Sequence, residues 1–138
     1  MDIQGGCYCG AIRYVATGEP ISRGMCFCRE CQHVASAGPN VVLAMPAAGF
    51  RYTMGEPARF ARSDLAAPAT REFCPTCGTQ LLTLSPRAVG AVLIKAGTLD
   101  DPSLVGMPQF AIHTAEKQPY HVVPEGVTAF AALPPGRG

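Results

Sequence analysis

The sequence carries little charge and has no long hydrophobic run. Only 15% of its 138 residues are charged, the formal net charge is +1, and Lys95 and Lys117 are the only lysines. Surfaces that bind nucleic acid need clustered Lys and Arg, so this composition argues against a nucleic-acid partner. The most apolar stretch, residues 41–50, contains Pro46 and Gly49 and is much shorter than the roughly 20 residues that span a bilayer.

The N-terminus also lacks a secretory signature. Residues 1–6 contain neither the basic region nor the apolar region of a signal peptide. We therefore expect a soluble, cytoplasmic protein that does not bind a membrane. In a reducing compartment, cysteines that occur in groups indicate a metal site or catalysis more often than disulfide bonds.

Glycine and proline are frequent, and they favour short strands over long helices. The 15 glycines and 13 prolines interrupt the chain too often for a long helix. Hydrophobic residues make up 48%, which is enough for the core of one domain over residues 1–138. Alternating apolar residues predict strands, as at Ile12, Tyr14 and Ala16. The predicted strands are 11–17, 41–44, 50–54, 58–63, 80–85, 91–96 and 109–113.

These segments together predict an all-β, or at least β-dominated, fold. A single helical turn is expected within residues 28–36, because Gly38-Pro39 ends it. Gly5-Gly6 is expected to form a turn before the first cysteines. The Pro- and Gly-rich end, residues 133–138, is expected to be a frayed tail.

The seven cysteines all fall in three short clusters, which are Cys7-Tyr8-Cys9, Cys26-Phe27-Cys28-Arg29-Glu30-Cys31 and Cys74-Pro75-Thr76-Cys77. Zinc prefers thiolates in a tetrahedral shell, and a C-x2-C turn supplies two of them. A closed site therefore needs a second pair, and Cys7 with Cys9 is the natural one. The central cluster then has three ligands and an open fourth position, which is typical of catalytic or substrate-binding zinc.

Ligand counting leaves other arrangements open. The central cysteines could share the ion of the C-x2-C turn and leave Cys7 and Cys9 as buried free thiols. A histidine could close the central site and make it purely structural; the candidates are His33, His113 and His121. A redox role for the C-x-C pairs is a further alternative, but they lack the strand-to-helix context of a thioredoxin-like site.

Five segments resemble one family, in order and at matching spacings. Residues 5–14, GGCYCGAIRY, resemble the opening G-G-C-x-C-G-x-[IV]-x-[FY] of the glutathione-dependent formaldehyde-activating enzyme and centromere protein V family. Residues 26–31 resemble its central C-x-C-x-x-C, and residues 73–81 resemble its F-C-x-x-C-G-[ST]-x-[LI]. Residues 96–102 and 113–120 are similar to two later segments, so the resemblance extends over residues 3–125.

This resemblance implies a compact fold of the β-tent kind, with two sheets pinned by a structural zinc. It implies two zinc ions per chain, of which the second need not be fully occupied. The ligands it implies are Cys7, Cys9, Cys74 and Cys77 for the structural zinc, and Cys26, Cys28 and Cys31 for the second, catalytic site. The founding activity of the family joins formaldehyde to glutathione and is classed as that of a carbon–sulfur lyase.

The sequence departs from the family pattern beside these ligands. Tyr8 and Phe27 stand inside the C-x-C motifs where His is frequent, and Tyr120 stands where Trp is usual. The ligands are unchanged, but the recognition of glutathione in particular is less firmly implied, and another thiol could be the co-substrate.

The function expected from the sequence is a zinc-dependent carbon–sulfur lyase-like enzyme. Its small-molecule partners would be a thiol and an aldehyde, joined in adducts such as S-hydroxymethylglutathione, and Arg29 or His33 could assist the developing alkoxide. The alternative is a non-catalytic, zinc-stabilised module that binds a thiol or a protein partner.

Overall fold

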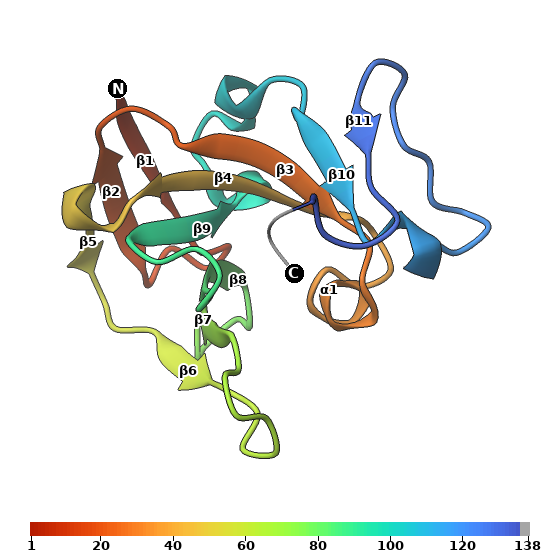
Figure 1. Ribbon diagram of the computed structural model, residues 1–138. Helices are drawn as coiled ribbons and strands as arrows, with labels where there is room; N and C mark the ends of the chain where they lie inside the picture. Colours follow the sequence, from red (N-terminus) through yellow and green to blue (C-terminus); the bar gives the residue numbers. More distant parts are fainter. Residues whose placement is uncertain (136–138) are drawn as a thin grey trace.

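The alternating segments of the chain form two β-sheets in the computed structural model, which describes residues 1–135 (Figure 1). The smaller sheet has the order β1-β2-β5, with β1 at Asp2–Gly6, β2 at Arg13–Thr17 and β5 at Phe50–Met54. The larger sheet has eight strands in the order β11-β10-β3-β4-β9-β8-β7-β6. Their bounds are β3 Ser22–Cys26, β4 Asn40–Pro46, β6 Ala58–Phe60, β7 Thr70–Phe73, β8 Gln80–Leu84, β9 Ala91–Lys95, β10 Phe110–Ile112 and β11 Thr128–Ala129.

Helical structure is confined to short segments. The α-helix α1 (Arg29–Val34) and four 3-10 turns, η1 (Ala47–Gly49), η2 (Ala96–Thr98), η3 (Pro102–Val105) and η4 (Thr114–Glu116), connect the strands. Within residues 1–135, no helix is long and apolar enough to cross a bilayer. Figure 1 shows the small sheet at one end of the long β3–β4 pair and α1 at the other. This mostly β, two-sheet architecture confirms the predicted fold class.

The main core joins the two sheets. Alternate residues of β2, Tyr14 and Ala16, are buried and belong to one cluster with Leu43 of β4 and Ile94 of β9. Full burial of an aliphatic side chain of this size contributes roughly 1.5–3 kcal/mol. The other buried members are Ile3, Cys7, Ile12, Met45, Cys74, Leu81, Leu82, Val92, Leu99 and Val105. Two cysteines of separate motifs are thus already part of the core.

The strand predictions succeed for the alternating or continuous apolar segments. Two of the missed strands, β1 and β3, contain glycine, and the other two are short and largely polar. Residues 50–54 form β5 as predicted, the other six predicted strands overlap observed ones, and the helical turn within 28–36 is α1. The predicted turn at Gly5-Gly6 is wrong, because both residues end strand β1. Strands β1, β3, β7 and β11 were not predicted. Of the expected frayed tail, residues 133–135 form no helix or strand, and residues 136–138 lie outside the described part of the chain.

Gly5 is required by a close approach between distant parts of the chain. A Cβ atom at this position would lie 2.3 Å from the Thr98 carbonyl oxygen and 2.3 Å from the Tyr14 hydroxyl. Gly5 also forms a bridge with Leu99, and the Asp100 N–H donates to the Gln4 carbonyl over 2.9 Å. Residues 98–100, which follow β9 of the large sheet, therefore pack against the edge strand β1 of the small sheet.

We predict that Gly5→Ala lowers the free energy of unfolding by about 1–3 kcal/mol, because the added methyl group overpacks this contact. The matched control is Gly97→Ala in η2, where a Cβ meets nothing within 4 Å. That control should change stability by less than about 1 kcal/mol. Urea unfolding of the two variants measures the difference, and equal stability would contradict the close approach.

Candidate functional site

Four cysteines meet where the two sheets join. The sulfur atoms of Cys7, Cys9, Cys74 and Cys77 all lie within 4.8 Å of one another. The Cys7–Cys9 and Cys9–Cys74 sulfur distances are 3.6 and 3.8 Å. A tetrahedron of sulfurs around zinc, with Zn–S near 2.3 Å, has edges of about 3.8 Å. The donor set therefore fits a zinc ion.

Backbone and hydroxyl groups hold these sulfurs in place. The Ile12 N–H donates to the Cys7 sulfur over 3.2 Å, and the Cys77 N–H donates to the Cys74 sulfur over 3.4 Å. Thr79 links the two cysteine turns, because its hydroxyl accepts from the Tyr8 N–H over 3.1 Å and lies 3.2 Å from the Cys77 sulfur. The Thr79 hydrogen bonds lower the pKa of the Cys77 thiol to about 5, which favours the thiolate that a metal requires.

The other three cysteines meet at the end of β3 and the start of α1. The sulfurs of Cys26, Cys28 and Cys31 lie within 4.8 Å of one another. Cys28 is the N-cap residue of α1, and its sulfur accepts from the Cys31 N–H over 3.3 Å. The Asn40 side chain donates to the Cys31 sulfur over 3.3 Å. This second cluster could also hold a zinc ion, with three sulfur ligands.

Charge in the second cluster concentrates on its most buried member. Hydrogen bonds from Cys26 and Cys28 lower the pKa of the Cys31 thiol, and Asn40 and the nearby Lys95 charge lower it further. The pKa of the Cys26 thiol is raised, because its hydrogen bonds with Cys28 and Cys31 and its burial favour the neutral form. The lowered pKa of Cys31 favours a buried thiolate that a cation can bind.

Histidines do not complete the second cluster within residues 1–135. His33 is exposed, and its Nδ1 lies 2.8 Å from the Arg29 carbonyl. His113 lies 3.4 Å from Glu116, and His121 accepts from the Gln118 N–H over 2.9 Å. None of the three histidines, nor any carboxylate of that range, joins the three sulfurs in one group of candidate ligands.

The C-terminal segment packs against the helix that carries the second cluster. The buried Gln32 side chain donates to the carbonyls of Phe27 (2.8 Å) and Glu116 (2.9 Å). The Arg29 N–H donates to the Glu116 carboxylate over 3.1 Å, and the Arg29 guanidinium donates to the Gln32 side chain. Residues 114–118 therefore fix the position of α1.

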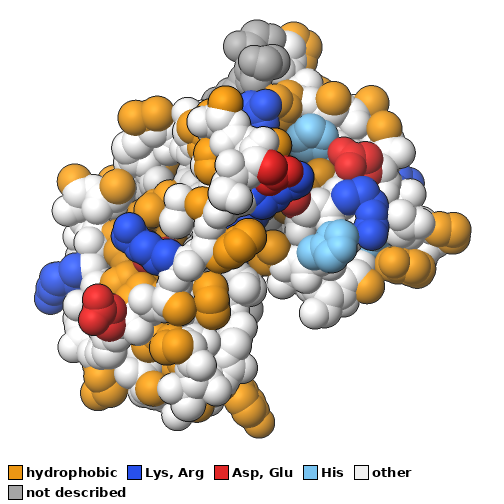
Figure 2. All heavy atoms as spheres, turned by 90° about the horizontal axis from the view of Figure 1, so that it is seen from below, with side chains coloured by type: hydrophobic (Ala, Val, Ile, Leu, Met, Phe, Trp, Pro, Cys, Tyr) orange, Lys and Arg blue, Asp and Glu red, His pale blue; other side chains and the backbone are white. Residues whose placement is uncertain are grey.

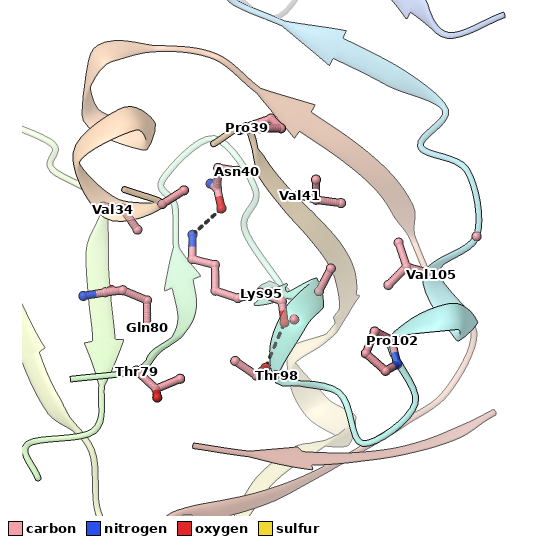
Figure 3. A pocket seen from close by; sticks show the side chains of 14 residues that line it. Val34, Pro39, Asn40, Val41, Thr79, Gln80, Lys95, Thr98, Pro102 and Val105 are labelled. Carbon is pink, nitrogen blue, oxygen red and sulfur yellow. Dashed lines mark hydrogen bonds between the residues drawn. The ribbon is translucent and has the colours of Figure 1, made fainter. Parts of the chain in front are cut away.

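A hollow of about 580 Å³ has neighbours of both clusters in its lining (Figure 3). Asn40, which contacts Cys31, and Thr79, which contacts Cys77, both line it. Figure 3 shows the Lys95 side chain reaching from β9 toward Asn40 inside this hollow. Thr98 and Pro102 line another side of the hollow. Between them, Leu99 and Asp100 contact strand β1 of the small sheet.

Asn40 and Lys95 were missed by sequence reasoning. The available signal was a lysine at the end of an otherwise apolar strand, Ala91–Ile94, in a chain with only two lysines. A lysine in such a strand is either at a surface edge or buried with polar partners. The structure shows the second case, since Lys95 is only 8% exposed.

The outer surface mixes charges of both signs. On the face shown in Figure 2, Lys and Arg side chains lie next to Asp and Glu side chains, with histidines among them. Ion pairs such as Arg71–Glu30 (3.1 Å) and Arg62–Asp64 (2.7 Å) are examples of such pairing in the structure. The basic side chains on that face therefore form no uniform positive patch.

Known proteins are similar to this chain in sequence and in fold. Residues 2–116 match the family described as glutathione-dependent formaldehyde-activating enzyme. A Halomonas elongata protein named "Putative glutathione-dependent formaldehyde-activating enzyme" is 29% identical over 94 residues, which is 63% of this chain and 59% of that protein. The crystal structure of a Rhodobacter sphaeroides protein, a structural genomics target, has a similar fold, with a TM-score of 0.60, 18% identity, and coverage of 75% of this chain and 94% of that one. Because the family match spans most of the sequence, the chain belongs to the glutathione-dependent formaldehyde-activating enzyme family.

Proposed function

We propose that the protein is a zinc-dependent carbon–sulfur lyase-like enzyme acting on adducts of a thiol and an aldehyde, such as S-hydroxymethylglutathione. The observation that carries this proposal is the Cys26, Cys28 and Cys31 cluster, which has three sulfurs and no further candidate ligand in residues 1–135. Membership of the family supports glutathione-dependent activation of formaldehyde as the reaction. A closed, purely structural site would need a fourth protein ligand.

In this proposal the two clusters have different roles. Cys7, Cys9, Cys74 and Cys77 hold a structural zinc that joins the sheets, because four sulfurs leave no open position. Cys26, Cys28 and Cys31 hold a second zinc with an open position. Zinc bound there supplies a Lewis acid that lowers the pKa of a thiol ligand and so favours the thiolate.

The reaction forms one bond and moves one proton. The sulfur of the thiolate attacks the aldehyde carbon, the carbon–sulfur bond forms, and the electron pair of the carbonyl bond moves to its oxygen. That oxygen takes up a proton, which replaces the one that the thiol lost on becoming a thiolate, and so forms the hydroxyl of the adduct. The reverse sequence releases aldehyde and thiol. Either Arg29 or His33, both exposed residues of α1, is the proposed group that stabilises the developing alkoxide.

We predict that Cys77→Ser and Cys28→Ser have unequal effects on stability. Cys77→Ser breaks a site whose members Cys9 and Cys74 are 65 residues apart, so the crosslink between the sheets is lost. This variant should be largely unfolded or free of zinc. Cys28→Ser breaks a site whose three sulfurs lie within six residues and which closes almost no chain. It should keep its β core, lose one zinc and lose thiol binding.

Thermal melting and elemental zinc analysis of both variants, next to the parent protein, measure these effects. The parent protein is expected to hold two zinc ions per chain. Equal destabilisation by the two substitutions would show that the second cluster is structural and would contradict the division of roles.

We further predict that the zinc-loaded protein accelerates the exchange of formaldehyde with S-hydroxymethylglutathione above the spontaneous rate. Two-dimensional exchange NMR at equilibrium measures this rate without a coupled enzyme. Cys28→Ser is the matched control and should show only the spontaneous rate. If the protein with both zinc ions gives no acceleration over a panel of thiols and aldehydes, the enzyme proposal fails and the non-catalytic binding module takes its place.

A further inference from the structure

Lys95 places a buried ammonium group beside the second cluster. The residue is the last of β9 and is 8% exposed. Its Nζ donates to the Asn40 Oδ1 over 2.9 Å and to the Thr83 hydroxyl over 3.0 Å. Within residues 1–135, no carboxylate forms an ion pair with it, whereas the neighbouring Arg71 is paired with Glu30. Lys95 is therefore a buried cation whose hydrogen-bond partners are both neutral.

Burial of an ammonium group without a counter-charge is strongly unfavourable. Burial lowers the pKa of Lys95 to about 8, and the nearby Arg71 charge adds to this effect. The groups that oppose the fall are Cys31, Cys26 and Cys28, in that order. The nearest acidic side chains that could compensate Lys95 are therefore those of the cysteine cluster.

Asn40 connects the ammonium group to the cluster. A lysine ammonium can only donate hydrogen bonds, so the Asn40 amide must turn its oxygen toward Lys95. The amide nitrogen then points the other way, and it donates to the Cys31 sulfur over 3.3 Å. An asparagine amide can take either of two orientations that exchange its oxygen and nitrogen. Lys95 selects the one in which the nitrogen faces the Cys31 sulfur, whereas the other would place the oxygen there and repel a thiolate.

From this geometry we infer that Lys95 is a positioning residue for the second zinc site: through Asn40 it directs an N–H donor at Cys31, and it balances the charge of the three-thiolate site. Lys95 touches neither the ligand sulfurs nor a substrate, so it acts through Asn40 and through its charge. The inference rests on the second zinc site of the proposed function.

The charges agree with this role. Three thiolates around one Zn²⁺ carry one net negative charge, and Lys95 neutralises it within the protein. Hydrogen bonds to ligand sulfurs and nearby charges are the outer-shell groups that tune a metal site, and removal of such a partner typically weakens metal affinity about 10–100-fold. In a variant that stays folded, loss of a lysine that only supported the fold would not weaken Zn²⁺ binding at the second site specifically.

The test measures the Zn²⁺ affinity of the second site by competition with a chromophoric chelator, on protein whose first site is loaded. Lys95→Met should bind the second Zn²⁺ about 10–100-fold more weakly than the parent protein. Lys95→Arg keeps the charge and should recover most of the affinity. Lys117→Met is the matched control, because Lys117 is the only other lysine and is exposed, and it should be unchanged.

Two further variants test whether Lys95 acts through Asn40. Asn40→Leu should weaken the second site by a similar factor, because it removes the donor at Cys31. In the Lys95→Met/Asn40→Leu double variant the loss should be clearly less than the product of the two single effects. Cobalt substitution adds a spectroscopic readout, since weaker thiolate ligation of Co²⁺ should reduce the sulfur-to-cobalt charge-transfer band in both single variants.

Several outcomes would overturn the inference. Second-site affinity in folded Lys95→Met equal to that of Lys117→Met would show that Lys95 has no role at the metal, and fully multiplicative effects would show that it does not act through Asn40. If Lys95→Met does not fold, Asn40→Leu becomes the deciding variant, and unchanged second-site affinity in it would overturn the inference. A parent protein without a second ion would overturn both this inference and the proposed site. An absence of enzyme turnover would overturn only the proposed function, because these readouts use metal alone.

Discussion

The architecture depends on bringing two cysteine turns together across the joint between the sheets. Cys7 and Cys9 follow β1 of the small sheet, and Cys74 and Cys77 follow β7 of the large sheet. Four thiolates at such distances repel one another strongly unless a cation lies between them. The same residues reach into the main core through buried Cys7 and Cys74. Under the proposed scheme, zinc binding and apolar packing therefore stabilise the same junction.

In the proposed scheme the first cysteine cluster supports the fold and the second carries the reaction. The second cluster is assembled within one short segment, and its surroundings are supplied from elsewhere: Asn40 from β4, Lys95 from β9, and Glu116 from the C-terminal segment. Asn40 and Lys95 also line the hollow described above. The three cysteines lie close together in the sequence, whereas the residues around them come from distant parts of the chain. Substitutions among those surrounding residues can therefore change the site without changing its candidate ligands.

The sequence predicted those features that depend on residue type and short spacing. The cysteine clusters, the β-dominated fold and strand 50–54 follow from thiolate chemistry and from alternation over a few residues. Strand β1 was missed because Gly5 looks like a turn residue, whereas its real constraint is the Thr98 carbonyl, which lies far away in the sequence. The Lys95–Asn40–Cys31 contacts were missed for the same reason, since the pairing of β4 with β9 brings these side chains together and no local pattern encodes it.

The spacing of the ligands also has a consequence for metal capture during synthesis. A chain emerges from the ribosome N-terminus first, and folding begins before synthesis ends. The three sulfurs of the second cluster are complete once Cys31 has emerged, whereas the first cluster must wait for Cys77. Under the proposed two-zinc scheme, the nascent chain therefore presents its open, exchangeable site to the cellular zinc pool before its permanent one. That early site can carry an ion while the sheets are still being made.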